Sequence, residues 1–306
     1  MSTQVKRKKK RSKFLGTMIN PTHFHRSQIK FLLIVLPFAI LMLLPMIFIV
    51  SHAFKPFSEL YAYPPKFFVR RPTLDSFRML FRITSQAGVP LVRYLFNSLI
   101  QAVGVIFFTL FFGSLAAYSF SFLSYRGKKI LFGANQIAIM FVAVAVAVPR
   151  YIVMNKLGLI NNYFSLIIPL IAMPVGVFLL KQFMDQIPLE LIDAAKIDGA
   201  NNFQIYLRVV VPLVKPALAT VAILSFQAAW NNTEASSLFV DDESLKTLAY
   251  YFSTMSLGSS ALANQGISAA ASLMMFLPNI VFFILVQNQV MNTMAYSGMK
   301  WWKRLN

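Results

Sequence analysis

Six apolar stretches, each about 20 residues long or longer, dominate this 306-residue sequence and limit what it can fold into. They cover residues 31–52, 95–123, 130–153, 163–183, 213–231 and 266–290. About 20 apolar residues in a helix cross the hydrocarbon core of a bilayer, and a helix satisfies its own backbone hydrogen bonds there. The sequence therefore predicts an all-α membrane protein with six transmembrane helices. Its six-span domain covers 31–291, between terminal tails at 1–30 and 292–306.

The first and third stretches each permit a second interpretation. A signal peptide has an apolar core of about 7 to 15 residues, whereas the first stretch is longer and no small-x-small cleavage site follows it. We interpret it as a retained first span. The third stretch contains VAVAVAVP, residues 142–149, which alternates in size as a strand does. Because it lies inside a long apolar run, we expect a helix.

Composition excludes several kinds of site. Only 13% of the residues are charged, about half the share found in soluble domains. The sequence has no cysteine, and its three histidines are His23, His25 and His52. We therefore expect no catalytic centre, no metal site and no cofactor on this chain.

The net charge of +19 raises the question of nucleic acid. Its densest run, KRKKKRSK at residues 6–13, lies in a polar tail shortly before an apolar stretch, and no nucleic-acid fold signature accompanies it. Basic residues in this place favour the anionic cytoplasmic leaflet by about 1 kcal/mol each. The sequence predicts contact with membrane lipid and none with nucleic acid.

Lys and Arg also predict the orientation. Nineteen of the 29 fall in segments on the same side of the membrane as the N-terminal tail. Positive residues are retained on the cytoplasmic side, so we expect a multi-pass membrane protein with both termini in the cytoplasm. The loop at 53–93 disagrees, because it carries seven bases on the outer side.

One part of that outer loop has a helical pattern. The segment TLDSFRMLFRI, residues 73–83, predicts a short helix on the outer membrane surface. We expect Thr73 to cap it and one apolar face to contain Phe77, Leu80 and Phe81.

A polar segment, PLELIDAAKIDGANNFQIYLRVVVP at residues 188–212, lies between the fourth and fifth stretches. Pro188 suits a first helical position, and Glu190 suits the positive end of a helix. The pair Asp198-Gly199 ends this helix with a turn in which Gly199 needs a positive φ.

A second short helix follows the turn. Asn201 or Asn202 can cap it. Its expected apolar face contains Phe203, Tyr206, Leu207 and Val210. The whole loop, 184–212, is predicted to stand out of the bilayer as a helix-turn-helix elbow on the cytoplasmic side.

The residue spacing in this elbow resembles the EAA loop of ABC-importer permeases, E-A-A-x2-D-G-A-x8-I-x-L-P. The matching residues run from Asp193 through Val209 to Pro212, with Asp for Glu and Val for Ile and Leu as conservative departures. The resemblance implies a type I ABC importer permease fold in which the elbow is the coupling helix that docks into an ATPase subunit. The residues it implies for this coupling are Glu190, Asp193, Ala194, Ala195, Asp198, Gly199 and Ala200.

Other segments are similar to carbohydrate-type permeases related to the smaller maltose-permease subunit. These are YLFNSLI at 94–100, the run at 155–200 that begins NKLGLINNY, AAWNN at 228–232 and MNTMAYSGMK at 291–300. The resemblance implies import of a sugar or oligosaccharide across the bacterial plasma membrane. It also implies an extracytoplasmic sugar-binding protein, a second homologous permease that makes a heterodimer, and a cytoplasmic ATPase dimer. No G-x-x-x-x-G-K-[ST] is present, so ATP and Mg are expected on that partner.

Three alternatives stay open. The importer can carry a solute other than a sugar. An ion-coupled secondary transporter would typically place Asp, Glu or His inside the membrane, and the cores of the six stretches contain no Asp or Glu. A membrane-embedded transferase or protease would need a converging set of carboxylates or a Ser/His/Asp set, and none is apparent.

The fifth stretch gains polar residues at its outer end. Gln227 lies three residues before Trp230 and four before Asn231, so it shares a helical face with both. The two amides can hydrogen-bond sugar hydroxyls while the indole ring covers an apolar face of the sugar. The three residues are therefore candidates for the substrate pathway. Alternatively they fix the helix end at the membrane interface, where Trp is enriched.

Overall fold

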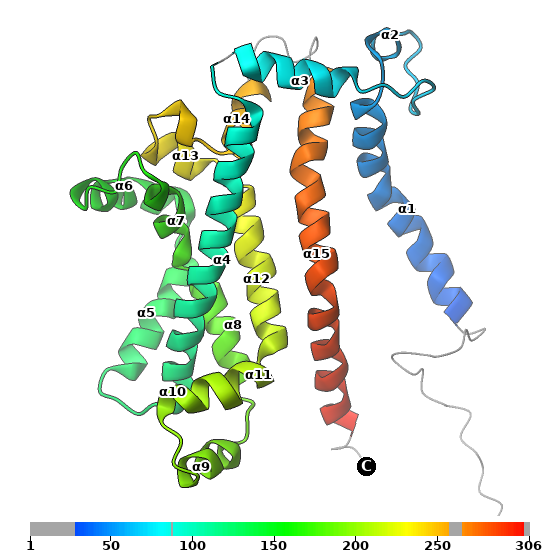
Figure 1. Ribbon diagram of the computed structural model, residues 1–306. Helices are drawn as coiled ribbons and strands as arrows, with labels where there is room; N and C mark the ends of the chain where they lie inside the picture. Colours follow the sequence, from blue (N-terminus) through cyan, green and yellow to red (C-terminus); the bar gives the residue numbers. More distant parts are fainter. Residues whose placement is uncertain (1–27, 87, 257–264, 303–306) are drawn as a thin grey trace, which may run out of the picture. The chain divides into compact units, whose positions relative to one another are not determined.

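The computed structural model describes residues 28–86, 88–256 and 265–302, and every regular element in these ranges is helical (Figure 1). The chain divides into two compact units, Met1–Met46 and Ile47–Asn306. Helix α1 (Gln28–Ala53) begins in the first unit and ends in the second. The basic run at 6–13 lies outside the described residues. The last helix continues to Trp302, into the predicted C-terminal tail.

The elements of the second unit follow one another with short connections. The first are α2 (Phe57–Leu60), α3 (Asp75–Gln86), α4 (Leu91–Phe122), α5 (Lys128–Met140), η1 (Ala143–Val146) and α6 (Ala147–Lys156). Then come α7 (Tyr163–Ile171), α8 (Pro174–Met184), α9 (Leu189–Ile197), α10 (Asn202–Ile205), η2 (Tyr206–Val210) and α11 (Val211–Leu213). The last are α12 (Lys215–Trp230), α13 (Glu234–Phe239), η3 (Glu243–Leu245), α14 (Leu248–Ser256) and α15 (Gln265–Trp302).

Helix α4 is the centre of the second unit. It packs against α7, α8 and α12, and α12 in turn packs against α15. Around its N-terminal end lies a buried cluster that includes Tyr94 and Trp230, and around its C-terminal end lies a second that includes Tyr118 and Leu180. Burying apolar side chains on both ends of one helix fixes the elements that carry the elbow.

The structure contains six candidate spans when each bent pair of helices is counted as one, and the predicted fifth span, 213–231, corresponds to the single helix α12. Leu32–Ala53, Leu91–Phe122 and Gln265–Val290 are each long and apolar enough to cross a membrane. The other three are bent pairs of helices: Lys128–Met140 with Val144–Lys156 at 113°, Tyr163–Ile171 with Pro174–Met184 at 47°, and Asn202–Leu213 with Lys215–Trp230 at 81°. Counted with each bent pair as one span, the total is six, as the sequence predicts.

The prediction of one continuous helix through 130–153 is wrong. Helix α5 ends at Met140, a 3-10 turn occupies Ala143–Val146, and α6 starts at Ala147. Pro149 accounts for the break, because it lacks an N–H and its ring clashes with the carbonyl four residues earlier. Hydropathy reports the length of an apolar run and does not show whether its helix is continuous.

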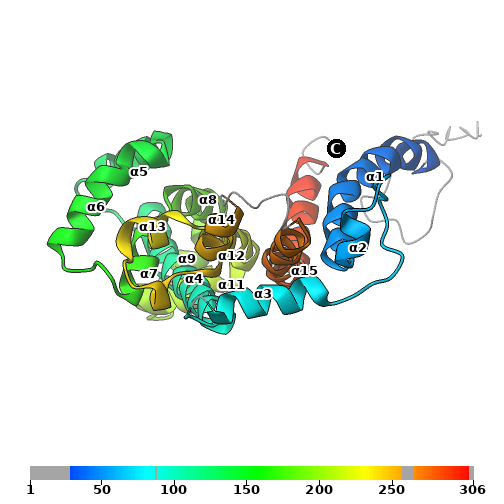
Figure 2. The ribbon, with the colours of Figure 1, turned by 90° about the horizontal axis from the view of Figure 1, so that it is seen from above.

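The predicted outer helix exists as α3, but its cap and its face differ from the prediction. The helix starts at Asp75, and the Thr73 hydroxyl has no hydrogen-bond partner. Its buried residues are Ser76, Leu80 and Thr84, whereas Phe81 is exposed. These three follow an i, i+4, i+8 row, and α3 packs with them on α15 and α4 (Figure 2). The helix therefore covers helix ends of the protein.

Gly104 provides a test of the packing between α4 and α7. A Cβ added there would lie 2.7 Å from Cδ1 of Ile167, whereas a Cβ at Gly133 meets nothing within 4 Å. We expect Gly104→Leu to lower the thermal unfolding temperature in detergent by several degrees, because overpacking costs about 1 to 3 kcal/mol. Gly133→Leu is the matched control and is expected to unfold with the wild type. Equal unfolding temperatures for the two variants would contradict this packing.

Candidate functional site

The elbow stands at the end of the second unit opposite α3, where Figure 1 draws α9 below the ends of α4 and α8. It consists of α9, a turn and α10, and it continues through η2 and α11 into α12. The polar helix-turn-helix that the sequence predicts over 188–212 is confirmed. Pro188 precedes α9 with an extended ψ of 132°, so Leu189 is the first helical residue.

The turn after α9 is built by backbone hydrogen bonds. Gly199 has a φ of +81°, which confirms the predicted positive φ. Its N–H donates to the carbonyl of Lys196 and the N–H of Ala200 donates to that of Ala195, both at 3.0 Å. This is the Schellman arrangement, in which a left-handed residue lets the chain satisfy the last carbonyls of a helix. The turn therefore sets where α9 ends and in which direction the chain leaves it.

Asn201 starts the second helix of the elbow. Its side-chain oxygen accepts from the N–H of Gln204, and the Gln204 side chain accepts from the N–H of Asn201, both at 2.9 Å. This capping box satisfies two donors that the first turn would otherwise leave free. Of the two predicted cap residues, Asn201 fills the position.

The predicted apolar face of the second helix is half wrong. Tyr206 and Val210 are buried, together with Ile205, but Phe203 and Leu207 are 56% and 47% exposed. Residues Tyr206–Val210 form a π-helix, whose i→i+5 hydrogen bonds widen the turn and change which residues share a face. A prediction based on 3.6 residues per turn therefore assigns the wrong residues to the buried face from this point on.

Two contacts attach the elbow to the helices above it. On α9, Ile192 is the one buried residue, and it packs in the cluster that includes Ile205 and Met184. On η2, the Tyr206 hydroxyl lies 2.6 Å from the hydroxyl of Ser114, a residue of α4. The elbow is therefore connected to α4 by a hydrogen bond as well as through the chain to α12.

The residues implied in coupling form the outside of the elbow. Glu190, Asp193, Ala194, Asp198 and Gly199 are exposed, and Ala195 and Ala200 are half-buried. The apolar side chains Leu189, Leu191 and Ile197 are exposed beside them, Ile197 to 86%.

The charges of this surface do little for its stability. Asp193 and Lys196 pair at 3.1 Å with both side chains exposed, an arrangement that contributes little. Small residues, exposed apolar side chains and carboxylates together fit contact with another protein. Within the described residues, no group of three or more His, Cys, Asp or Glu side chains is placed to hold a metal ion.

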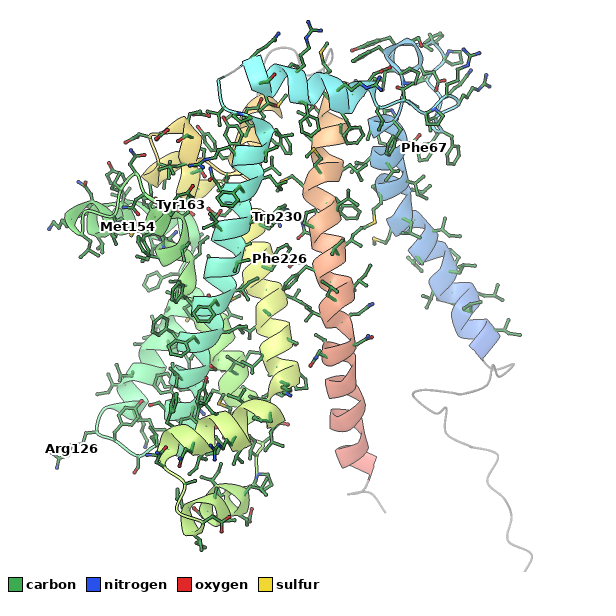
Figure 3. The ribbon with its side chains drawn as sticks, viewed as in Figure 1. Phe67, Arg126, Met154, Tyr163, Phe226 and Trp230 are labelled. Atoms are coloured by element: carbon green, nitrogen blue, oxygen red, sulfur yellow. The ribbon has the colours of Figure 1, made fainter. Side chains whose placement is uncertain are left out.

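The candidate substrate-pathway residues separate into two kinds. Trp230 is only 1% exposed, its indole N–H donates to the Met275 carbonyl at 3.0 Å, and its ring stacks on Phe226 (Figure 3). It is a packing residue between α12 and α15. Gln227 and Asn231 are exposed, and the Asn231 amide donates to the Gln227 carbonyl at 3.1 Å. The structure therefore does not bring the indole ring and the two amides to one open surface.

A cavity that the sequence did not predict lies where α7 and α8 meet. It has a volume of about 420 Å³, and residues of α4, α5, α7, α8 and α12 line it. Thr109 donates to the Ile171 carbonyl at 3.3 Å and Asn135 donates to the Pro174 carbonyl at 3.1 Å. The sequence signal that could have predicted this cavity was the presence of these two polar residues inside apolar stretches, together with Pro174 in a neighbouring stretch. Its lining is mostly apolar.

Comparison with known proteins gives the family. The profile described as "Binding-protein-dependent transport system inner membrane component" matches residues 29–291. The trehalose transport system permease protein SugB of Mycobacterium tuberculosis (strain CDC 1551 / Oshkosh) is 30% identical over 84% of this chain and 92% of its own. The arabinooligosaccharides transport system permease protein AraQ of Bacillus subtilis (strain 168) is 28% identical over 86% and 92%.

A solved structure supports the fold. The chain resembles a chain in the crystal structure of a bacterial ABC transporter involved in the import of the acidic polysaccharide alginate, with a TM-score of 0.72 and 23% identity. The likeness covers 88% of this chain and 99% of that one. With a profile match over most of its length, this chain belongs to the family of binding-protein-dependent transport system inner membrane components, the multi-pass permeases of ABC importers.

Proposed function

We propose that this permease, paired with a second homologous permease, forms the path by which a sugar or oligosaccharide enters the cell. The relatives named for trehalose and arabinooligosaccharides support a carbohydrate over another solute. ATP and Mg are bound and ATP is hydrolysed by a separate ATPase dimer, and an extracytoplasmic binding protein delivers the sugar. The continuous spans Leu32–Ala53 and Gln265–Val290 contain no Asp or Glu, which disfavours ion coupling.

The observation that carries this proposal is the construction of the elbow. Its outer surface is exposed, both of its helix ends at the turn are capped, and Ile192 and Tyr206 attach it to the bundle. A partner that pushes on such a surface moves α9 as one body, since the capped turn resists local bending. The displacement then reaches α4 through Ser114 and α12 through η2.

The proposed orientation follows the charges. The elbow and both termini lie in the cytoplasm, so the ATPase meets the elbow and the binding protein meets α3 and α14 on the other side. In this arrangement the residues at 1–30 and 292–306 are cytoplasmic tails on either side of the six-span domain.

Gly199 gives the direct test of coupling. A side chain there meets nothing within 4 Å, so a substitution acts through the backbone alone. Gly199→Val forces a β-branched residue to a φ of +81°, which costs about 1 to 2 kcal/mol, whereas Asn adopts this conformation readily. We expect Gly199→Val to lose most of the ATPase stimulation by sugar-loaded binding protein in a reconstituted transporter.

The matched control is Gly199→Asn, which is expected to keep most of the stimulation, and both variants are expected to insert normally. Full stimulation of the Gly199→Val transporter would show that the elbow does not couple. Equal losses in both variants would show that open space at this position matters instead of backbone conformation.

Tyr206 tests the connection between the elbow and α4. We expect Tyr206→Phe to reduce stimulated ATP hydrolysis severalfold, because the buried hydroxyl no longer holds Ser114; the loss of such a bond costs about 1 kcal/mol. Ser114→Ala is expected to have the same effect, and the double variant no more than either. Additive losses in this double-mutant cycle would show that the two hydroxyls act separately.

Gln227 and Asn231 stay the proposed sugar contacts of this chain. If these amides bind sugar hydroxyls, the double variant Gln227→Ala with Asn231→Ala loses neutral hydrogen bonds to the sugar. We expect the ratio of the ATPase rates stimulated by two different sugars to change by about 2- to 10-fold. Ser237→Ala, at an exposed polar residue of α13, is the control. An unaltered sugar profile with lower protein yield would leave both amides as packing residues.

A further inference from the structure

The segment between α1 and α4 carries more positive charge than its side of the membrane explains. Residues 53–93 contain seven Lys and Arg against two carboxylates, Glu59 and Asp75. Lys and Arg near spans are usually retained in the cytoplasm, and the proposed orientation puts this segment outside. A basic segment on that side opposes the general rule for insertion, so its charge serves something other than topology.

Hydrogen bonds within the segment hold its loop in place. The amino group of Lys55 is buried and donates to the Lys66 carbonyl. The Glu59 carboxylate accepts from the backbone N–H groups of Arg70 at 3.0 Å and Arg71 at 3.1 Å. Because Glu59 binds the backbone of these arginines, their guanidinium groups stay available. Because Lys55 is buried, the exposed charge comes from the other bases.

The orientation of α3 presents two of these bases outward. Its buried face, Ser76, Leu80 and Thr84, rests on α15 and α4. Arg78 and Arg82 are one helical turn apart on the opposite face, and both are exposed. Since α3 lies over the ends of α4 and α15, this face points away from the spans.

The exposed bases Lys66, Arg70, Arg71, Arg78 and Arg82 together form what we call the basic face. Among the described residues its one ion pair is between Arg78 and Asp75, at 3.6 Å and exposed, which neutralises little of it. Next to α3 is a groove of about 470 Å³ whose lining includes Thr73, Asp75 and Arg78. Arginine beside a groove is typical of surfaces that bind carboxylates of another protein.

We propose that the basic face docks an acidic surface of the extracytoplasmic binding protein. The proposal rests on the orientation given above and on the family's dependence on such a protein. Opposite charges speed the encounter of two proteins and set their relative orientation, while contributing less to the lifetime of the complex. The basic face thus speeds the encounter with the binding protein and sets the orientation in which it docks.

The test uses the complete transporter in nanodiscs and follows ATPase activity as the concentration of sugar-loaded binding protein rises. We expect Arg78→Glu with Arg82→Glu to raise the half-maximal concentration about tenfold at low salt and to leave the maximal rate unchanged. The difference should shrink at 1 M salt, where the screening length falls to about 3 Å. Arg78→Lys with Arg82→Lys keeps the charge and should behave nearly as the wild type.

Controls separate this proposal from the ones before it. Arg126→Glu reverses an exposed charge between α4 and α5 and should have no effect on the half-maximal concentration. An unchanged concentration for the Arg78/Arg82 double reversal would overturn the docking proposal while leaving the importer function intact. If the shift in half-maximal concentration vanishes in nanodiscs of zwitterionic lipid, the basic face binds anionic headgroups instead. That result would also overturn the docking proposal.

The orientation has its own test, because the sequence contains no cysteine. A single Arg82→Cys substitution in intact cells should react with a membrane-impermeant maleimide. Labelling only after the cells are opened would show that α3 faces the cytoplasm, which contradicts both the orientation and the docking.

Discussion

In lipid, every backbone polar group needs a partner from the protein itself, and the other features of this permease depend on that requirement. Where its spans are continuous, the helix supplies the partners. Where a span breaks between α7 and α8, Thr109 and Asn135 supply them to the carbonyls of Ile171 and Pro174. The break is therefore tolerated because neighbouring helices carry donors at the same depth, and it opens the cavity beside it.

The elbow meets a different requirement, since it has to keep its shape with little core of its own. Local hydrogen bonds give it that shape: the Schellman turn at Gly199 and the capping box at Asn201. Its attachment comes from elsewhere in the chain, through Ile192 in a buried cluster and Tyr206 against Ser114. A rigid outer surface with a specific inner attachment is what a part needs if it is to receive force from one protein and pass it to another.

The two kinds of interaction also explain what could be predicted from the sequence. The spans, the positive φ of Gly199 and the Asn201 cap depend on composition or on hydrogen bonds within a few residues, and they were predictable. The break before Ala143 comes from Pro149, which a count of apolar residues does not register. The π-helix at Tyr206–Val210 and the buried face of α3 depend on neighbours distant in sequence. For the same reason Trp230 appeared to share a face with Gln227, although its ring packs on Phe226 and its N–H binds a carbonyl of α15.

Helix α4 runs for 32 residues without a proline or a break, which makes it about 48 Å long. At one end Asn97 holds the carbonyls of Ser244 and Lys246, in the segment that leads into α14, and toward the other Ser114 holds Tyr206 of the elbow. Such a rod acts as a lever: a tilt of about 5° moves one end by about 4 Å relative to the other over a helix of this length. A tilt of α4 at the end that contacts the elbow therefore moves the end that carries Asn97 as well, with no need for any element between them to change shape.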